Sequence, residues 1–187
     1  MRKIDLFIST MFGSGLIPGP GGTYGSIMQL AIMILVYHLA PLELRLHWCV
    51  FAICFTFLFG LLSIPNVIEE LQNKSVEDKK SSSGDFNSIN IDEAHGISIS
   101  VLPIFIIQPE YWFISIMLSF TLFRFFDIVK PLGIAIFEKK MSGKKNDLGW
   151  KALIIMLDDT IAGIYAGIVT FGGILGYQWL LIHVINN

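Results

Sequence analysis

Residues 89–99 read INIDEAHGISI and place two adjacent acids, Asp92 and Glu93, at the edge of an apolar run that continues to Ile107. An acid in such a place can cap a helix, face solvent by chance, or form part of a site. The apolar run itself predicts a helix in an apolar environment. The remainder of the chain bears on which interpretation holds.

The composition of the chain predicts an integral membrane protein. Hydrophobic residues make up 53% of the 187 positions and charged residues only 15%, with a mean hydropathy of +0.66. Soluble domains carry about 25% charged residues. We therefore expect a single membrane-embedded domain over residues 1–187. The basic residues form no patch interleaved with aromatic residues, which argues against a nucleic-acid partner.

Five apolar segments predict an all-α membrane bundle of about four to five helices. They cover residues 26–40, 48–64, 96–107, 111–126 and 161–185. A membrane span needs about 20 residues, whereas the twelve residues of the third segment give only about 18 Å of helix. This segment either begins earlier, near Ile89, or is a re-entrant or buried helix, and the sequence leaves its crossing of the bilayer open.

The distribution of basic residues predicts the topology. If the segments form two hairpins and a final span, twelve basic residues fall on one side, and the loops of the other side contain only Arg45. The basic side of a membrane protein is normally cytoplasmic, so we expect a multi-pass protein of the inner (plasma) membrane. The twelve residues are Arg2, Lys3, Lys74, Lys79, Lys80, Arg124, Lys130, Lys139, Lys140, Lys144, Lys145 and Lys151.

Residues 66–91 are expected to form a polar cytoplasmic loop. Its first part begins as an amphipathic helix, and SSSGD at residues 81–85 has the composition of a flexible linker.

A glycine-rich stretch, FGSGLIPGPGGTYGS at residues 12–26, precedes the first apolar segment. Its six glycines and two prolines predict an irregular loop whose backbone N–H groups can approach a ligand closely. Thr23 and Ser26 add hydroxyl groups, and Ser26 could instead cap the next helix. The plainer alternative is a kinked loop at the membrane surface. Candidate phosphate-binding residues here are Gly13, Ser14, Gly15, Thr23 and Ser26.

Further acids and bases occur in FRFFDIVKP, residues 123–131, and MLDDTIAG, residues 156–163. Arg124, Asp127 and Lys130 are spaced three apart and are expected to share one helical face. Asp158 and Asp159 are expected to open the fifth segment, as Asp92 and Glu93 open the third.

One acid at each helix start would suffice as a cap, but paired acids repel one another unless a cation binds them. Carboxylates suit Mg²⁺, and Arg124 and Lys130 suit a phosphate. Asp85 is a further acid on the same side.

Four blocks of this sequence, covering nearly the whole chain, resemble the phosphatidylglycerophosphatase A family of bacterial membrane enzymes. They are Gly13-Ser14-Gly15 with Gly22-Thr23-Tyr24-Gly25-Ser26, Asp85 with INIDEAHG, FRFFDIVKP, and MLDDTIAG. The chain departs from the family pattern at Asn90, Gly133, Ala152 and Ile154, but keeps the acids and bases. The resemblance implies an Mg²⁺-dependent phosphatase that converts phosphatidylglycerophosphate to phosphatidylglycerol and phosphate.

On this hypothesis, the four predicted metal ligands hold one or two Mg²⁺ ions. Asp127 either orients Arg124 and Lys130 or joins the metal ligands. Water or a carboxylate is the nucleophile.

Besides phosphatidylglycerophosphate, the expected partners are membrane lipids; the sequence leaves the oligomeric state open. The alternatives are a small ion or phosphate transporter that uses the acids as a cation site, and a non-catalytic assembly protein. The predicted metal ligands are Asp92, Glu93, Asp158 and Asp159.

Overall fold

The computed structural model describes residues 3–17, 21–77, 88–130 and 147–185, and in these ranges every regular element is a helix. In chain order the elements are α1 (Lys3–Ser9), the 3₁₀ turn η1 (Ser14–Leu16), α2 (Gly21–Leu39), α3 (Leu42–Glu77), α4 (Ile91–Ile107), α5 (Trp112–Val129), α7 (Leu148–Leu180) and the π-helical turn η4 (Leu181–Ile185).

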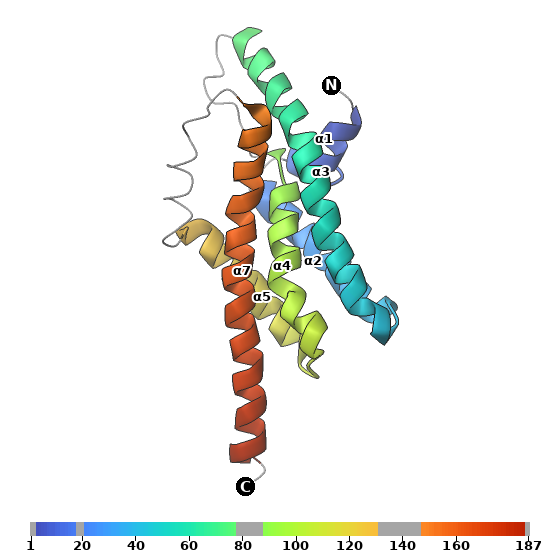
Figure 1. Ribbon diagram of the computed structural model, residues 1–187, viewed down its shortest axis with the longest axis vertical. Helices are drawn as coiled ribbons and strands as arrows, with labels where there is room; N and C mark the ends of the chain where they lie inside the picture. Colours follow the sequence, from blue (N-terminus) through green and yellow to red (C-terminus); the bar gives the residue numbers. More distant parts are fainter. Residues whose placement is uncertain (1–2, 18–20, 78–87, 131–146, 186–187) are drawn as a thin grey trace.

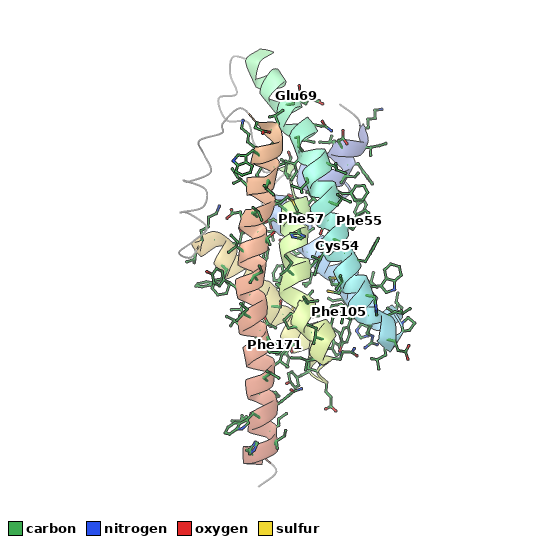
Figure 2. All side chains as sticks on the ribbon, viewed as in Figure 1. Cys54, Phe55, Phe57, Glu69, Phe105 and Phe171 are labelled. Carbon is green, nitrogen blue, oxygen red and sulfur yellow. The ribbon has the colours of Figure 1, made fainter. Side chains whose placement is uncertain are left out.

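Helix α4 lies at the centre of the bundle. It packs against α2, α3, α5 and α7, and Figure 1 shows it between α3 and α7, with α2 and α5 behind. Each of these four surrounding helices is long and apolar enough to cross a membrane. Their outer surfaces carry large apolar side chains such as Phe55 and Phe171, both labelled in Figure 2. The all-α membrane bundle expected from the sequence is confirmed.

The third apolar segment belongs to a helix that begins at Ile91, which agrees with the alternative that it starts earlier than residue 96, near Ile89. Helix α4 has 17 residues, about 26 Å at ~1.5 Å per residue, and is nearly as long as the 18-residue α5. The two helices run antiparallel, because Arg124 near the end of α5 contacts Glu93 in the first turn of α4. Helix α4 therefore follows α5 along its length and does not turn back halfway.

Two clusters of buried apolar side chains lie one above the other along the bundle. The larger includes Ile97, Phe105 and Phe123 and joins α2, α3, α4, α5 and α7. The smaller includes Met11, Ile68 and Met156 and joins the N-terminal segment to α3, the start of α4 and the first turns of α7. The start of α4 belongs to both clusters, through Ile91 and Ala94 to the smaller and through Ile97 to the larger, so Asp92 and Glu93 lie where the two clusters meet.

Two helices extend past this level, which corrects two predictions. Helix α3 continues to Glu77, so the loop predicted over residues 66–91 is helical in residues 66–77, as the amphipathic pattern of its first part had indicated; residues 81–85, the expected linker, and Asp85 lie outside the described residues. Helix α7 begins at Leu148, where Asp147 accepts hydrogen bonds from the N–H groups of Gly149 and Trp150. Asp158 and Asp159 therefore lie inside α7 and do not open it.

The glycine-rich stretch is partly helical, which corrects the prediction of an irregular loop over residues 12–26. Helix α2 begins at Gly21, and Ser26 lies within it, so Ser26 is not a helix cap. The glycines here serve close packing. A Cβ at Gly25 would lie 2.5 Å from Cβ of Asn90, and one at Gly15 would lie 2.1 Å from the carbonyl oxygen of Ser88.

Helices α4 and α7 cross closely at Gly96 and Gly163, which gives a first prediction. A Cβ at Gly163 would lie 2.5 Å from the Gly96 carbonyl oxygen, so Gly163→Ala should destabilise the protein by about 1–3 kcal/mol through overpacking. Gly172→Ala, in the same helix with open space around the new methyl group, is the matched control and should not destabilise. Thermal unfolding in detergent measures both, and equal unfolding temperatures would contradict the tight crossing.

Candidate active site

The fold brings the predicted acids and bases together from four helices. The start of α2 contributes Ser26, the first turn of α4 contributes Asp92 and Glu93, and the inside of α7 contributes Asp158 and Asp159. The end of α5 contributes Arg124, Asp127 and Lys130. These eight residues are called the charged cluster below.

Arg124 is held by two carboxylates. Its Nη1 donates to Oε2 of Glu93 and lies 3.1 Å from Oδ2 of Asp127, one helical turn along α5. The same Glu93 oxygen accepts a hydrogen bond from the Ser26 hydroxyl at 2.5 Å. Ser26, Glu93, Arg124 and Asp127 thus form one connected network across α2, α4 and α5.

Lys130 reaches the other acidic pair. It is the residue that ends α5, in a left-handed conformation with φ 44°, so it does not continue the helical face of Arg124 and Asp127 as the spacing had predicted. Its Nζ forms an ion pair with Oδ2 of Asp158 on α7. Both bases of the charged cluster are therefore bound to carboxylates in this structure.

A cavity of about 430 Å³ lies beside the ion pair of Lys130 and Asp158. Its polar lining comes from Asp92, Asp158, Asp159 and Lys130, and its apolar lining from Ile89, Ile154 and Ile155. Ser26, Glu93 and Arg124 do not line it. The cavity is large enough for a phosphate group and ions, since one water occupies about 30 Å³.

Asp159 is the most confined acid of the charged cluster. Its side chain is 5% exposed, and its Oδ2 is buried without a hydrogen-bond partner among the described residues. The carboxylates of Asp92, Glu93, Asp127 and Asp158 all lie near enough to interact with it electrostatically. A buried carboxylate without a donor is costly unless a cation or a proton compensates it.

The acids at the start of α4 are also destabilised in their charged form. Burial raises the pKa of Asp92 to about 8, and repulsion by Glu93 adds to the shift. Burial also raises the pKa of Glu93, although the charge of Arg124 opposes that shift. Burial is the main cause in both cases, and the positive charge near these two acids does not outweigh it.

The turn at residues 13–15 uses its own donors internally. The N–H of Gly13 bonds to the Thr10 hydroxyl, and those of Ser14 and Gly15 bond to the carbonyl oxygens of Met11 and Thr10. Gly13 itself has φ 91°, a left-handed conformation that favours glycine. These three N–H groups are thus already engaged within the turn. Thr23 lies in the first turn of α2, half-buried.

Two further residues, Asn90 and Gly22, lie next to the charged cluster, although neither was predicted from the sequence to have a role in a site. Asn90 precedes α4 and is fully buried; its N–H donates to the Ser9 carbonyl oxygen and its side chain to the Ser14 hydroxyl. Gly22 lies against Glu93, because a Cβ there would lie 1.5 Å from Oε1. The sequence signal for Asn90 was its departure from the family pattern; Gly22 stands in the stretch that resembles the family's opening motif, without a role of its own assigned.

The charged cluster suits a divalent cation by its chemistry. Five carboxylates face two bases, a formal excess of three negative charges. Carboxylate oxygens are ligands that Mg²⁺ prefers, and Oδ2 of Asp159, which has no hydrogen-bond partner among the described residues, is available as such a ligand. In the described ranges, however, no three acidic, histidine or cysteine side chains already converge at metal-binding distances. The donors fit the ion, and they would have to draw together around it.

Fold and site together define a class: a helical membrane protein that collects carboxylates and two bases where α4 begins and α5 ends, an arrangement that suits an enzyme acting on a lipid phosphate. The comparison of the sequence with protein families then assigns it. The chain belongs to the phosphatidylglycerophosphatase A family, which it matches over residues 7–174, and the protein is a phosphatase.

Two relatives are similar along nearly their whole length. The phosphatidylglycerophosphatase A of Haemophilus influenzae is 34% identical over 176 residues, covering 91% of this chain and 92% of that protein. A protein of Bacteroides thetaiotaomicron, provisionally named a phosphatidylinositol-3-phosphatase, is 32% identical over 166 residues, covering 89% and 91%. No solved structure matches the chain.

Proposed function

We propose that this protein is an Mg²⁺-dependent phosphatase that hydrolyses phosphatidylglycerophosphate to phosphatidylglycerol and inorganic phosphate. Membership of the family supports the reaction, and the name of the Haemophilus influenzae relative supports the substrate. The reaction completes the synthesis of an anionic membrane lipid. We place it at the cytoplasmic face of the inner membrane, because twelve of the thirteen basic residues fall on the side of the charged cluster in the expected topology.

The observation that carries the metal requirement is the environment of Asp159. A buried carboxylate with a partnerless oxygen, near four other carboxylates, needs a cation or a proton to compensate its charge, and one divalent cation can compensate several of these acids together. The substrate phosphate is itself an anion, so the charged cluster needs added positive charge before it can attract the phosphate.

Each part of the charged cluster has a distinct role in this mechanism. Asp92, Asp158 and Asp159 face the cavity and would hold the ion. Glu93, the fourth ligand predicted from the sequence, does not line the cavity and contacts Ser26 and Arg124 instead. When bound, Mg²⁺ supplies polarisation of the phosphate ester and a water of lowered pKa. Lys130 neutralises charge on the phosphate oxygens in exchange for its contact with Asp158. Arg124 does so with the N–H groups that Glu93 and Asp127 do not engage, and Asp127 orients it.

The two relatives carry different substrate names, so the choice of lipid is tested directly. Purified protein in detergent is supplied with phosphatidylglycerophosphate or phosphatidylinositol 3-phosphate, with Mg²⁺ or with chelator, and released phosphate is measured. We expect release from phosphatidylglycerophosphate at least about tenfold faster, a difference of roughly 1.4 kcal/mol, and none with chelator. Equal or faster release from the inositol lipid would overturn the substrate, and release in chelator would overturn the metal requirement.

The transporter alternative is tested with the same purified protein reconstituted into sealed vesicles. A transporter would move phosphate or a cation into sealed vesicles without consuming lipid. Transport without hydrolysis would therefore contradict the proposed function.

A further inference from the structure

Glu93 differs from the three acids that line the cavity because protein groups from two other helices lie against its carboxylate oxygens. Its Oε2 accepts hydrogen bonds from Ser26 and Arg124. Its Oε1 fills the space where any side chain larger than that of Gly22 would begin. Glu93 does not line the cavity that Asp92, Asp158 and Asp159 share. Its contacts identify it as the junction between α2, α4 and α5.

Ser26 is positioned for Glu93 and not for a ligand. Its side chain is fully buried, and it is absent from the lining of the cavity. Its hydroxyl lies 2.5 Å from the Glu93 carboxylate and 2.9 Å from the Gly22 carbonyl oxygen in the preceding turn. A hydroxyl has one proton and can donate to only one of these two acceptors. The bond to the charged carboxylate is the stronger of the two.

Arg124 receives its orientation from the carboxylates around it. Glu93 contacts Nη1 from α4, and Asp127 contacts the same nitrogen from one turn away on α5. A guanidinium group has five N–H donors in a fixed plane. Holding one edge of that plane with two carboxylates sets the direction of the remaining donors.

We propose that Ser26 is a positioning residue that fixes Glu93 and, through it, the guanidinium group of Arg124, so that the remaining N–H donors meet the phosphate of the substrate. Gly22 leaves the space in which the Glu93 carboxylate sits. The sequence predicted Ser26 as a phosphate ligand; the geometry instead indicates that Ser26 acts on the phosphate indirectly, through Glu93 and Arg124. The inference rests on the proposed function, because it assigns Arg124 to the substrate phosphate.

A double-mutant cycle tests the inference. Ser26→Ala, Glu93→Gln and the double variant are purified, and binding of inorganic phosphate in the presence of Mg²⁺ is measured by calorimetry alongside kcat and KM. Ser26→Ala should weaken phosphate binding and raise KM about tenfold, the effect of one lost charge-assisted hydrogen bond, with a smaller change in kcat. In the Glu93→Gln background, Ser26→Ala should weaken phosphate binding and raise KM by less than about a further twofold, because the contact through which Ser26 acts on Arg124 is already lost.

Ser63→Ala is the matched control, since Ser63 is equally buried but donates only to the Phe59 carbonyl oxygen within α3; it should leave phosphate binding unchanged. Full additivity of Ser26→Ala and Glu93→Gln would overturn the inference, as would unchanged phosphate binding in Ser26→Ala. Phosphate binding is measured without lipid. A wild-type protein that binds phosphate but hydrolyses no lipid therefore refutes the proposed function separately from the role of Ser26.

Discussion

Asp159→Asn should lower phosphate release about a thousandfold, a loss of roughly 4 kcal/mol of transition-state stabilisation. Asp159 is buried inside α7, and its Oδ2 has no hydrogen-bond donor among the described residues. An amide retains the size of the side chain but removes the charge that would hold a cation. The rate of phosphate release from phosphatidylglycerophosphate in saturating Mg²⁺ measures the effect.

The stability of the same variant separates a lost site from a lost fold. Because four other carboxylates lie near Asp159, Asp159→Asn removes a repelled buried charge and should not lower the unfolding temperature in the absence of metal. Wild-type protein should gain stability from added Mg²⁺, as any ligand of the native state provides, and the variant should not. Glu110→Gln, an exposed change at the opposite end of the bundle, should behave as wild type. Near-normal activity in Asp159→Asn would remove Asp159 from the mechanism.

Arg124→Lys should raise KM by about 10- to 100-fold, although the charge is retained. Lysine carries a single ammonium group and lacks the planar set of donors that can contact two carboxylates and a phosphate together. In this protein Arg124 already contacts Glu93 and Asp127, so its replacement also leaves two partly buried acids less well compensated. Steady-state kinetics with phosphatidylglycerophosphate, at fixed Mg²⁺, provide the measurement.

Arg45→Lys is the control for the loss of guanidinium geometry in general. Arg45 lies over the ring of Tyr37, 4.6 Å from its centroid, at the end of the bundle away from the charged cluster. This change should leave KM unaffected. If Arg124→Lys also left KM and phosphate binding unchanged, the assignment of Arg124 to the substrate phosphate would be wrong.

The helical architecture was predictable because apolar composition and segment length have few alternative solutions in a membrane. The five apolar segments correspond to α2, α3, α4, α5 and α7. The start of α4 at the acids was foreseeable from the pair itself, since acids favour the first turn of a helix. The central, enclosed place of α4 was among the alternatives, as a buried helix, but the sequence did not select it, because the choice depends on packing against four other helices.

The helix ends were predicted less well, and the reason is physical. Charges were taken to mark both the membrane boundary and the helix boundary, but α3 and α7 continue beyond the level of the charged cluster and pack a second apolar core there. Residues 148–157, LGWKALIIML, favour a helix and carry one charge, which is consistent with such an extension.

The glycine-rich stretch shows how tertiary packing overrides local preference. Glycine is unfavourable inside a helix by about 1 kcal/mol, so a sequence with several glycines predicts a loop. Here Gly22 and Gly25 are helical because Glu93 and Asn90 occupy the space beside them. The partners lie about 65 residues further along the chain, and no local pattern contains them. The network of Ser26, Glu93 and Arg124 was hidden for the same reason.

The central claim is that the acids facing the cavity hold a divalent cation, and direct binding tests it most simply. Mn²⁺, used as a spectroscopic substitute for Mg²⁺, is titrated into detergent-purified wild-type protein and the Asp159→Asn variant, and free ion is followed by electron paramagnetic resonance. The account predicts at least one tightly bound Mn²⁺ per wild-type chain, displaced by Mg²⁺, and affinity at least about tenfold weaker in the variant. Equal binding by the two proteins, or none by the wild type, would contradict it.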